Sequence, residues 1–362
     1  MQKAYSASRI FTGTSWLENH TIITENETIK EITPNKQLDT RSFDNQMIVP
    51  AFIDAQVYGA AGKLLSVFPE PSSLQTMYET FRKQGTILCQ PTLATNTLDV
   101  FKKAIDAVKI YWQNGGKGIY GLHLEGPWLN EIKRGAHVKE LIHAPEIAEV
   151  KDLLEYGKGV VTMITIAPEV CSEEVIHLIK SYGIVISAGH SNATYEQAMA
   201  SFEKDITTIT HLYNAMSPLQ HRAPGLVGAA FNHQSIRASI IPDGHHVDFS
   251  AITIAKKIMG SRLFAITDAV TETSTGPYQH QLAGDKYESN NILSGSAISM
   301  HQAFVNLVEK IGIDQDEALR MCSLYPAEVM GCQEQYGKIA PGFTAQFLVL
   351  NNDLSVAEII TC

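Results

Sequence analysis

The sequence predicts an α/β protein: a (β/α)8 barrel of the TIM type accompanied by a small β module built from both ends of the chain. Between about residues 47 and 270, short β-branched runs alternate with longer helical patterns, as in parallel strands joined by crossover helices. Titratable residues follow several of these runs, at the strand ends where such barrels hold their chemistry. Both ends of the chain instead show short alternating segments.

The β-branched runs are the predicted barrel strands. Eight strand-helix repeats favour a closed barrel over an open sheet. The strands are expected at residues 47–57, 85–93, 118–125, 160–167, 183–190, 207–211, 235–242 and 263–268. Helices are expected at residues 72–84, 100–112, 146–156, 172–182, 194–203 and 249–259, with 300–311 and 314–330 completing the ring.

The two ends of the chain are predicted to pair with each other. Residues 8–12, 21–31 and 337–350 alternate between apolar and polar positions, with turn residues between segments. A period of two residues is typical of strands. We therefore expect residues 1–46 and 333–362 to form one small β domain beside a catalytic barrel at 47–332.

Composition restricts the class of protein. With 362 residues, 44% hydrophobic and 18% charged, the chain has the make-up of an ordinary globular enzyme. Its net charge of −10 argues against nucleic-acid binding, which requires clustered Lys and Arg. The five scattered cysteines form no Cys-x-x-Cys pair and favour a reducing cytoplasm. No leader-like N-terminus is present, and no apolar run approaches the roughly 20 residues that span a bilayer, so membrane attachment is not expected.

Three strand-end residues form a candidate metal site. Glu125, His190 and His211 close the third, fifth and sixth runs. One carboxylate and two imidazoles suit a zinc-like ion and leave a coordination position for water. Each residue alone also has a structural interpretation, as a helix cap, an ion-pair partner or a hydrogen-bonded core histidine. Their joint placement favours a shared ligand role. Ligand softness favours Zn²⁺, while Fe²⁺, Co²⁺ and Mn²⁺ stay open.

Asp268 closes the last predicted strand and faces the same barrel mouth. A bound metal ion lowers the pKa of water to about 7, and an ionised Asp can take the released proton and return it to a leaving amine. The alternative is an ordinary helix cap. His123, two residues before Glu125, is as well explained by a structural role as by ligation.

The first strand lacks a pair of metal-binding histidines. Gln56 and Tyr58 occupy the positions where metallohydrolases of this layout usually carry His-x-His, and a neutral amide and a phenol are poor zinc ligands. The fourth run, 160–167, contains no Lys that could bridge two metals as a carbamate. We therefore expect one ion, with the role of Tyr58 open between filling the vacant position and contacting substrate.

Basic loops surround the predicted mouth. Arg222 and His246 follow the sixth and seventh runs. Arg can hold a phosphate through two parallel hydrogen bonds, and a nearby His adds a donor. A surface role in solubility explains each of them equally well. The adjacent pair His245 and His246 is not expected to form a second metal site, since neighbouring side chains point apart.

Several motifs carry a family resemblance over nearly the whole chain. They are the segments 121–127 (GLHLEGP), 135–137 (GAH), 188–191 (AGHS), 210–216 (THLYNAM), Arg222 with 224–225 (PG), 243–247 (DGHHV), 267–269 (TDA) and 293–296 (LSGS). In these motifs the chain resembles the N-acetylglucosamine-6-phosphate deacetylases of the amidohydrolase superfamily. The absence of the first-strand histidines resembles the members that work with a single ion.

The resemblance implies a (β/α)8 barrel with a small β-sandwich from both termini, usually as a homodimer with active sites near the interface. It implies that Glu125, His190 and His211 hold the metal, that Asp268 is the base, and that His137 polarises the acetamide carbonyl. Arg222 and His246 are implied as phosphate binders. The full set of implied substrate contacts is Ala136, Asn214, Ala215, Arg222, His246, Leu293, Ser294 and Gly295.

The activity expected from residues and resemblance together is hydrolysis of N-acetyl-D-glucosamine 6-phosphate to D-glucosamine 6-phosphate and acetate, a step of amino-sugar catabolism. Deacetylation of N-acetylgalactosamine 6-phosphate is the nearest alternative, because the two sugars differ at one hydroxyl. A non-catalytic barrel that serves as a binding module is the second. A nucleobase deaminase is less favoured, because such enzymes generally use the first-strand histidines that Gln56 and Tyr58 replace here.

Overall fold

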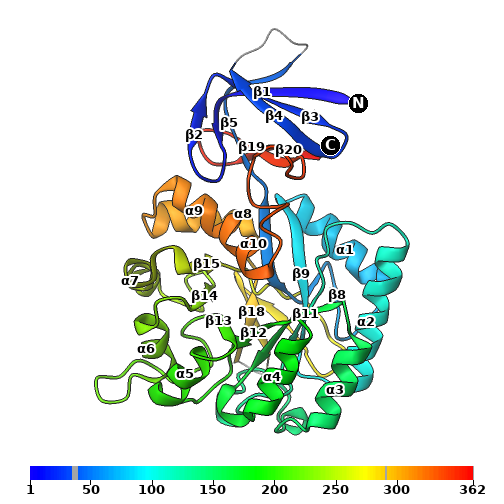
Figure 1. Ribbon diagram of the computed structural model, residues 1–362, viewed down its shortest axis with the longest axis vertical. Coiled ribbons are helices and arrows are strands. Elements are labelled where there is room, and N and C mark those ends of the chain that lie inside the picture. The colour runs from blue at the N-terminus through cyan, green and yellow to red at the C-terminus, as the bar shows by residue number, and fades with distance from the viewer. Residues whose placement is uncertain (35–39, 290–291, 362) are drawn as a thin grey trace.

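The computed structural model describes residues 1–34, 40–289 and 292–361. A small β-sheet module that contains both termini lies at one end of the long axis, and the larger α/β body lies below it (Figure 1). The chain passes from the module into the body once near residue 50 and returns after the last helix.

The body is the predicted parallel barrel. Its eight-stranded sheet has the order β15-β14-β13-β12-β11-β10-β9-β6, and a parallel bridge from Val57 to Ala269 joins the first strand to the end of the last. The strands are β6 (Phe52–Val57), β9 (Thr86–Ala94), β10 (Leu122–Glu125), β11 (Val161–Ile166), β12 (Val185–Ala188), β13 (Ile206–Ile209), β14 (Arg237–Ile240) and β15 (Leu263–Ala265).

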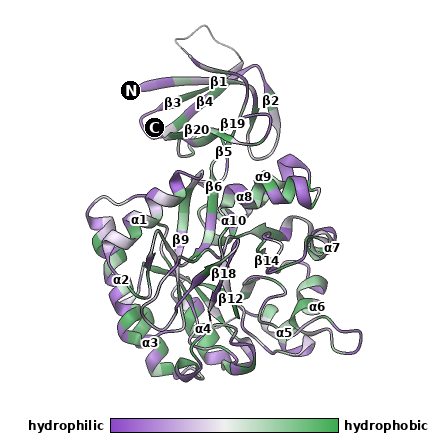
Figure 2. Ribbon diagram, turned by 180° about the vertical axis from the view of Figure 1, so that it is seen from behind, coloured by the Kyte–Doolittle hydropathy of each residue, from purple (hydrophilic) through white to green (hydrophobic). Residues whose placement is uncertain are grey.

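The predicted helices form the outer layer. They are α1 (Pro71–Arg82), α2 (Leu98–Gln113), α3 (Ile147–Tyr156), α4 (Glu173–Ser181), α5 (Tyr195–Phe202) and α7 (Phe249–Met259). In α2 the buried Phe101, Ile105 and Val108 recur at helical spacing, and the Thr97 hydroxyl caps the helix by accepting from the Val100 amide at 3.4 Å. Such helices turn an apolar face to the sheet and a polar face to solvent, as the colouring of Figure 2 shows.

One further helix, α6 (Gly225–Asn232), was not predicted. Every residue from Gly225 to Phe231 is buried. A helix that is apolar on all sides has no period of 3.6 residues by which a sequence pattern could reveal it. It lies in the connection between β13 and β14, where the barrel topology requires a crossover.

The last two predicted helices are divided. The first is α8 (Met300–Val305), which continues as a π-helical segment at Asn306–Lys310. The second consists of α9 (Gln315–Cys322) and α10 (Leu324–Met330). Ser323 breaks it with φ −139° and ψ −70°, and its hydroxyl donates to the carbonyl of Leu319 at 2.6 Å. The prediction of one continuous helix at 300–311 and another at 314–330 was therefore wrong, because each consists of two segments.

The terminal module is a seven-stranded mixed sheet of order β20-β19-β5-β1-β3-β4, with β2 paired to β1. Its strands curl around Ile10, Ile22, Ile48, Phe347 and Val349, all fully or almost fully buried. The strands are β1 (Gln2–Phe11), β2 (Trp16–Glu18), β3 (His20–Glu25), β4 (Thr28–Pro34), β5 (Arg41–Pro50), β19 (Gln346–Leu350) and β20 (Val356–Thr361). The predicted pairing of the two ends is confirmed.

The run 47–57 was predicted as one barrel strand, but its two halves belong to different sheets. Met47 and Ile48 pair with Arg9 and Ile10 of the terminal sheet, and the barrel strand begins only at Phe52. Pro50 has no N–H with which to continue a ladder, and both halves of the run are buried because each faces a core. The domain limits 46/47 and 332/333 stay a proposal.

Two small sheets that the sequence did not predict lie beside the ends of the barrel strands. The three-stranded antiparallel sheet comprises β16 (Gln281–Ala283), β17 (Lys286–Ser289) and β18 (Ile292–Ser296), and the two-stranded one comprises β7 (Gly59–Ala60) and β8 (Lys63–Leu64). No helix in the described part of the chain combines the length and apolar character needed to cross a bilayer.

Candidate active site

A cavity of about 300 Å³ opens at the C-terminal ends of the barrel strands. This volume is at the small end of the range for ligand pockets in proteins. All the candidate site residues named from the sequence line it except Arg222. They are Glu125, Ala136, His137, His190, His211, Asn214, Ala215, His246, Asp268, Leu293, Ser294 and Gly295.

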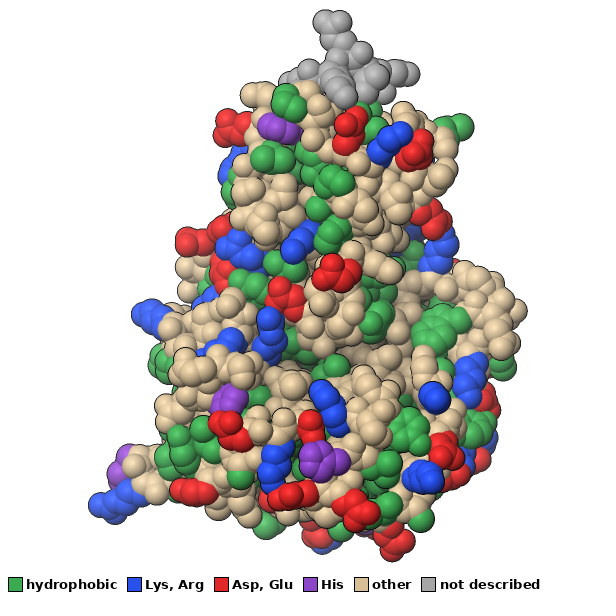
Figure 3. All heavy atoms as spheres, in the orientation of Figure 1, with side chains coloured by type: hydrophobic (Ala, Val, Ile, Leu, Met, Phe, Trp, Pro, Cys, Tyr) green, Lys and Arg blue, Asp and Glu red, His purple; other side chains and the backbone are tan. Residues whose placement is uncertain are grey.

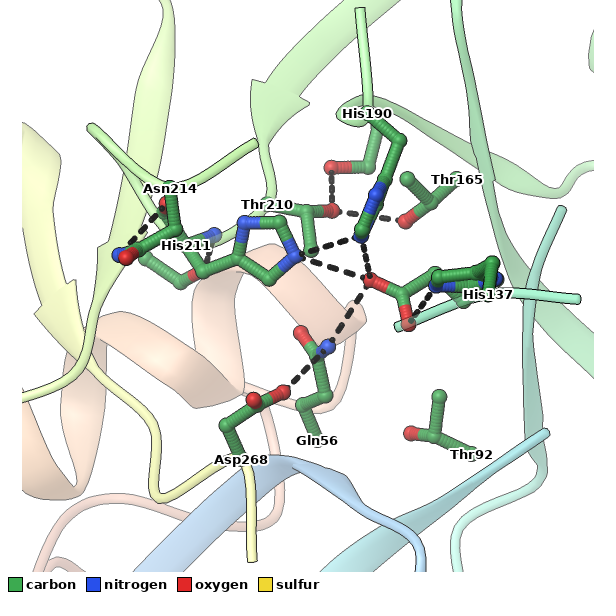
Figure 4. A network of polar contacts seen from close by, with 12 residues as sticks. Gln56, Thr92, His137, Thr165, His190, Thr210, His211, Asn214 and Asp268 are labelled. Atoms are coloured by element: carbon green, nitrogen blue, oxygen red, sulfur yellow. Dashed lines mark hydrogen bonds and ion pairs between the residues drawn. The ribbon is translucent and has the colours of Figure 1, made fainter. Parts of the chain in front are cut away.

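The candidate metal ligands converge at the barrel rim (Figure 4). Oε1 of Glu125 lies 3.3 Å from Nε2 of His190 and 3.0 Å from Nε2 of His211, and the two nitrogens are 3.1 Å apart. Bonds of about 2.0–2.1 Å at tetrahedral angles separate donor atoms by roughly 3.3 Å. The three atoms therefore have the spacing that one divalent ion requires.

The hydrogen bond on the far side of His190 sets its tautomer. Nδ1 of His190 lies 2.9 Å from the carbonyl oxygen of Lys133. A carbonyl only accepts, so Nδ1 carries the proton and Nε2 presents its lone pair toward Glu125. Metal-binding histidines are commonly oriented in this way by a partner on the second nitrogen.

His137 is a third imidazole beside the same carboxylate. Its Nε2 lies 3.3 Å from Oε2 of Glu125, so distance alone also permits a ligand group of Glu125, His137 and His190. The amide N–H of Thr95, however, donates to Nδ1 of His137 at 3.2 Å. The neutral ring must then carry its proton on Nε2, and a protonated nitrogen cannot bind a metal.

The electrostatics of His137 agree with a donor role. Burial, with the charge of His190 as a second cause, lowers the pKa of His137 to about 4, so the ring is neutral at physiological pH. These contacts favour Glu125, His190 and His211 as the ligand set. They favour Nε2 of His137 as a hydrogen-bond donor, with Oε2 of Glu125 at 3.3 Å as its acceptor in this structure.

Asp268 also lines the cavity and is 8% exposed. Its Oδ1 accepts from Nε2 of Gln56 at 2.8 Å, and its amide donates to the carbonyl of Gln56 at 3.1 Å. Burial raises the pKa of Asp268 above its ordinary value. A fixed carboxylate with a raised pKa is suited to taking up and returning a proton.

Three of these residues have a backbone conformation that is rare outside glycine. The φ angles of His190, His211 and Asp268 are 46°, 38° and 56°. Such left-handed residues cost energy and gather at functional sites. Each of them immediately or closely follows the end of its barrel strand, where the turn directs the side chain into the mouth.

The residue after Glu125 must be glycine. Gly126 has a φ of 87°, and a Cβ at this position would lie 2.2 Å from Oγ1 of Thr95. The close approach of Thr95 to this turn places its amide against His137. The Glu-Gly pair of the sequence motif therefore has a steric cause.

Gln56 and Tyr58 occupy the space between the two carboxylates. Nε2 of Gln56 lies 2.8 Å from Oδ1 of Asp268, 3.3 Å from Oε1 of Glu125 and 2.8 Å from the Tyr58 hydroxyl, and that hydroxyl donates to Oε2 of Glu125. Burial and the charge of Glu125 hold the pKa of Tyr58 well above its usual range. Both groups are neutral donors where a second cation would otherwise lie, which supports a single ion.

His123 lies deeper in the barrel and does not line the cavity. Its Nε2 lies 2.7 Å from the hydroxyl of Thr165, which in turn lies 2.7 Å from the hydroxyl of Thr210. Burial lowers the pKa of His123 to about 4. These contacts favour its structural interpretation.

His246 presents a supported imidazole to the cavity. Its Nδ1 lies 2.6 Å from Oδ2 of Asp243, whose Oδ1 accepts from the amides of His245 and His246 at 2.9 and 2.8 Å. Burial opposes ionisation of Asp243, but the hydrogen bond and charge of His246 keep its pKa below the ordinary value. His245 instead pairs with Asp285 at 2.8 Å, so the adjacent histidines do point apart.

Arg222 is not brought into this cavity. It lies in an exposed stretch, 218–223, that projects from the body before α6 at the lower left of Figure 1, and the same corner of Figure 3 carries basic and histidine side chains. Within one chain, His246 and Arg222 therefore do not form a joint phosphate site.

The titratable cavity residues that were not found from the sequence are Lys133, Tyr278 and His280. None of them ends a predicted strand, because Lys133 closes a short 3-10 helix and the other two belong to a loop, in connections whose position depends on tertiary packing. A polar residue in a loop carries no periodic signal that would separate it from ordinary surface polarity.

Comparison with known proteins decides the family. A model of the amidohydrolase family matches residues 47–361, and a model of the NagA composite domain matches residues 4–41. The chain is 33% identical to an N-acetylglucosamine-6-phosphate deacetylase of Haemophilus influenzae over 96% of this chain and 94% of that protein. The chain belongs to the N-acetylglucosamine-6-phosphate deacetylase family. It is thus a metal-dependent amidohydrolase that acts as a carbohydrate N-deacetylase, and not a non-catalytic barrel.

Members of this family and their neighbours share the whole architecture. The crystal structure of the Pasteurella multocida N-acetylglucosamine-6-phosphate deacetylase superposes with a TM-score of 0.94 at 33% identity, covering 100% of this chain and 98% of that one. An N-acetylgalactosamine-6-phosphate deacetylase of Escherichia coli O157:H7 is 30% identical over 99% of this chain and 98% of that protein. Overall sequence identity therefore does not distinguish relatives named for the glucosamine substrate from relatives named for the galactosamine substrate.

Proposed function

We propose that this enzyme hydrolyses the acetamide of N-acetyl-D-glucosamine 6-phosphate to D-glucosamine 6-phosphate and acetate. The observation that carries the proposal is one cavity with a metal-ligand set, a carboxylate of raised pKa and a neutral imidazole donor. A Mycobacterium smegmatis deacetylase, 25% identical with a TM-score of 0.92 over 99% of this chain and 98% of that one, has been crystallised as an aspartate-to-alanine mutant with N-acetyl-D-glucosamine 6-phosphate.

One divalent ion, Zn²⁺ by ligand softness, fits the residues present. Glu125, His190 and His211 would hold it, because their donor atoms lie 3.0–3.3 Å from one another. When bound, such an ion lowers the pKa of water and polarises a carbonyl. Fe²⁺, Co²⁺ and Mn²⁺ accept the same donors.

Asp268 carries the proton through the reaction. It takes a proton from the water that attacks the acetamide carbon. It then delivers that proton to the amine nitrogen as the carbon-nitrogen bond breaks, so that the amino sugar leaves neutral. The hydrogen bond from Gln56 at 2.8 Å fixes Oδ1, which leaves the second oxygen for this work.

His137 acts on the carbonyl oxygen. The Thr95 amide keeps the proton of His137 on Nε2, and this N–H donates to the oxygen as it gains negative charge. A preorganised donor of this kind lowers a barrier by a few kcal/mol, about 3–4 in measured cases. The pKa of His137, about 4, keeps it a hydrogen-bond donor and not an acid that titrates near neutrality.

The sugar and its phosphate are bound by the remaining cavity residues. His246, whose Nδ1 is held by Asp243, is the phosphate donor within the chain. Ala136, Asn214, Ala215, Leu293, Ser294 and Gly295 form the walls that contact the sugar.

Arg222 is assigned to the phosphate of a second copy. The resemblance implies a homodimer with active sites near the interface, and the exposure of the loop 218–223 supports a contact of Arg222 with a second copy. The test is complementation between Arg222→Ala and Asp268→Asn, which should each be poorly active alone. When the two variants are unfolded and refolded together, activity should return, because one of the two active sites in a mixed dimer then has both Arg222 and Asp268. Unchanged low activity in a verified mixed dimer contradicts the assignment.

We also place the enzyme in the cytoplasm. The cysteines among the described residues, Cys89, Cys171, Cys322 and Cys332, are free thiols, as a reducing compartment favours.

The direct test of the function is acetate release from N-acetyl-D-glucosamine 6-phosphate by the purified protein, with and without a chelator. Release that stops on chelation and returns with Zn²⁺ is expected. Absence of release from the metal-loaded enzyme contradicts the proposal. N-acetylgalactosamine 6-phosphate is the second candidate, since relatives of similar identity carry that name; comparing kcat/KM for the two sugars decides between them.

A further inference from the structure

His280 is an imidazole in the cavity that the reaction described above does not use. It lies on the segment between β15 and β16 and is 4% exposed. It lines the cavity together with Leu293, Ser294 and Gly295 of β18. The residue therefore borders whatever fills the cavity.

Neighbouring groups hold His280 firmly. Its Nδ1 lies 2.8 Å from the hydroxyl of Ser294, and its carbonyl accepts from the amide of Thr273 at 3.1 Å. The ring of Tyr278 stacks on it at 6.4 Å between centroids and 10° between planes. The Tyr278 hydroxyl donates to the carbonyl of Thr95 at 2.6 Å, which ties this segment to the loop that orients His137.

His246 and His280, two cavity histidines outside the proposed ligand set, differ in their partners. Asp243 supports His246, whereas Nδ1 of His280 lies against the neutral Ser294 hydroxyl. Burial lowers the pKa of His280 to about 4, so the ring is uncharged at neutral pH. An uncharged imidazole gains less from a phosphate dianion than a carboxylate-supported one does.

The pair of His280 and Ser294 can both donate and accept. When the Ser294 hydroxyl donates to Nδ1, the other ring nitrogen carries a proton; when Nδ1 donates to the hydroxyl, the other nitrogen accepts. A sugar hydroxyl is likewise both donor and acceptor. A phosphate dianion only accepts hydrogen bonds, so it would use only the state in which the other ring nitrogen carries a proton.

We propose that His280, positioned by Ser294 and Tyr278, binds a ring hydroxyl of the amino sugar and thereby helps to determine which sugar is accepted. This inference rests on the proposed function, because it assumes a phosphorylated amino sugar in the cavity. It assigns the uncharged His280 to the sugar ring and leaves the phosphate to His246.

The test variant is His280→Phe, which keeps an aromatic ring against Tyr278 and removes both nitrogens. His280→Gln is the conservative variant that restores a donor and acceptor, and His246→Gln is the phosphate-side comparison. Melting curves establish that each variant is folded. The measured quantity is kcat/KM for N-acetylglucosamine 6-phosphate, its 3-deoxy and 4-deoxy analogues, and N-acetylglucosamine without phosphate.

His280→Phe should lower kcat/KM by roughly tenfold, by the same factor with and without the phosphate, and His280→Gln should recover part of it. For the analogue that lacks the hydroxyl bound by His280, kcat/KM should already be low in the unaltered enzyme. His280→Phe should lower that kcat/KM little further. His246→Gln should affect only the phosphorylated sugars.

A loss in His280→Phe that disappears without the phosphate, or an unchanged kcat/KM, or equal losses on every analogue, would overturn the inference. Failure of the proposed function is a different result, because the unaltered enzyme would then release no acetate from any of these sugars.

Discussion

The amide N–H of Thr95 donates to Nδ1 of His137 at 3.2 Å. The opposite arrangement holds for His190, whose Nδ1 faces the Lys133 carbonyl at 2.9 Å. Two imidazoles beside one carboxylate therefore have opposite tautomers, and the backbone selects them. One is fitted to bind a metal through Nε2 and the other to donate from Nε2.

Because the tautomers of His190 and His137 differ, the same substitution to Gln is expected to have different effects at the two positions. His190→Gln should lose bound metal and activity together. His137→Gln should keep its metal while kcat falls by about 10²–10³, the usual effect of removing one oxyanion donor. Metal content by mass spectrometry, measured beside kcat, distinguishes them. Loss of metal from His137→Gln would show that the ligand set is assigned incorrectly.

Asp268→Asn removes the proton carrier without removing the hydrogen bond from Gln56 at Oδ1. We expect an unchanged metal content and melting temperature, with kcat lowered by about 10²–10⁴, the range for general acid-base catalysis. Steady-state acetate release measures it. The matched control is Asp243→Asn, which should act mainly on KM for the phosphorylated sugar because Asp243 supports His246. Full turnover by Asp268→Asn would exclude Asp268 as the base.

Tyr58→Phe should weaken metal binding. The Tyr58 hydroxyl donates to Oε2 of Glu125, and losing a partner of a ligand typically costs 10- to 100-fold, roughly, in metal affinity or activity. Competition with a chromogenic chelator gives the Kd. Tyr111→Phe is the control, since its hydroxyl bonds the Lys117 carbonyl at 2.8 Å, outside the cavity. Equal affinities in Tyr58→Phe and the unaltered enzyme would contradict the role.

The buried His123 predicts a loss of stability in mild acid. Its pKa is about 4 in the folded protein and about 6.5 in an unfolded chain. Above pH 6.5 both states are neutral. As the pH falls from 6.5 to 4, only the unfolded chain takes up the proton, so the free energy of unfolding falls, by roughly 3 kcal/mol from this residue.

Urea denaturation of the metal-free protein at several pH values measures that slope. His123→Gln should be less stable at neutral pH but should lose less stability on acidification. Ile164→Val, a buried apolar change on the neighbouring strand, should lower stability by about 1 kcal/mol and keep the slope. Parallel curves for His123→Gln and the unaltered protein would refute the prediction.

The barrel could be predicted because the β-branched runs alternate with helical patterns and several of the runs end in a titratable residue. Glu125, His190, His211 and Asp268 all follow such runs, and the topology then brings them to one mouth. Helix α6 and the sheet of β16, β17 and β18 were not predicted. The first is apolar on all sides, and the second is short and partly exposed.

The protonation state of His137 could not be predicted, because it depends on Thr95, 42 positions away in sequence, whose amide lies 3.2 Å and whose hydroxyl lies 2.8 Å from Nδ1 of His137. The exposed position of Arg222 also depends on the loop conformation and not on residue type. The pairing of His280 with Ser294 requires the short antiparallel sheet to be in place.

The most direct measurement is diffraction from zinc-loaded crystals at the zinc absorption edge. We expect one anomalous peak per chain within about 2.0–2.2 Å of Oε1 of Glu125 and of Nε2 of His190 and His211, with Nε2 of His137 not bonded to it. Two peaks per chain, a peak bonded to His137, or no peak among these three side chains would contradict it.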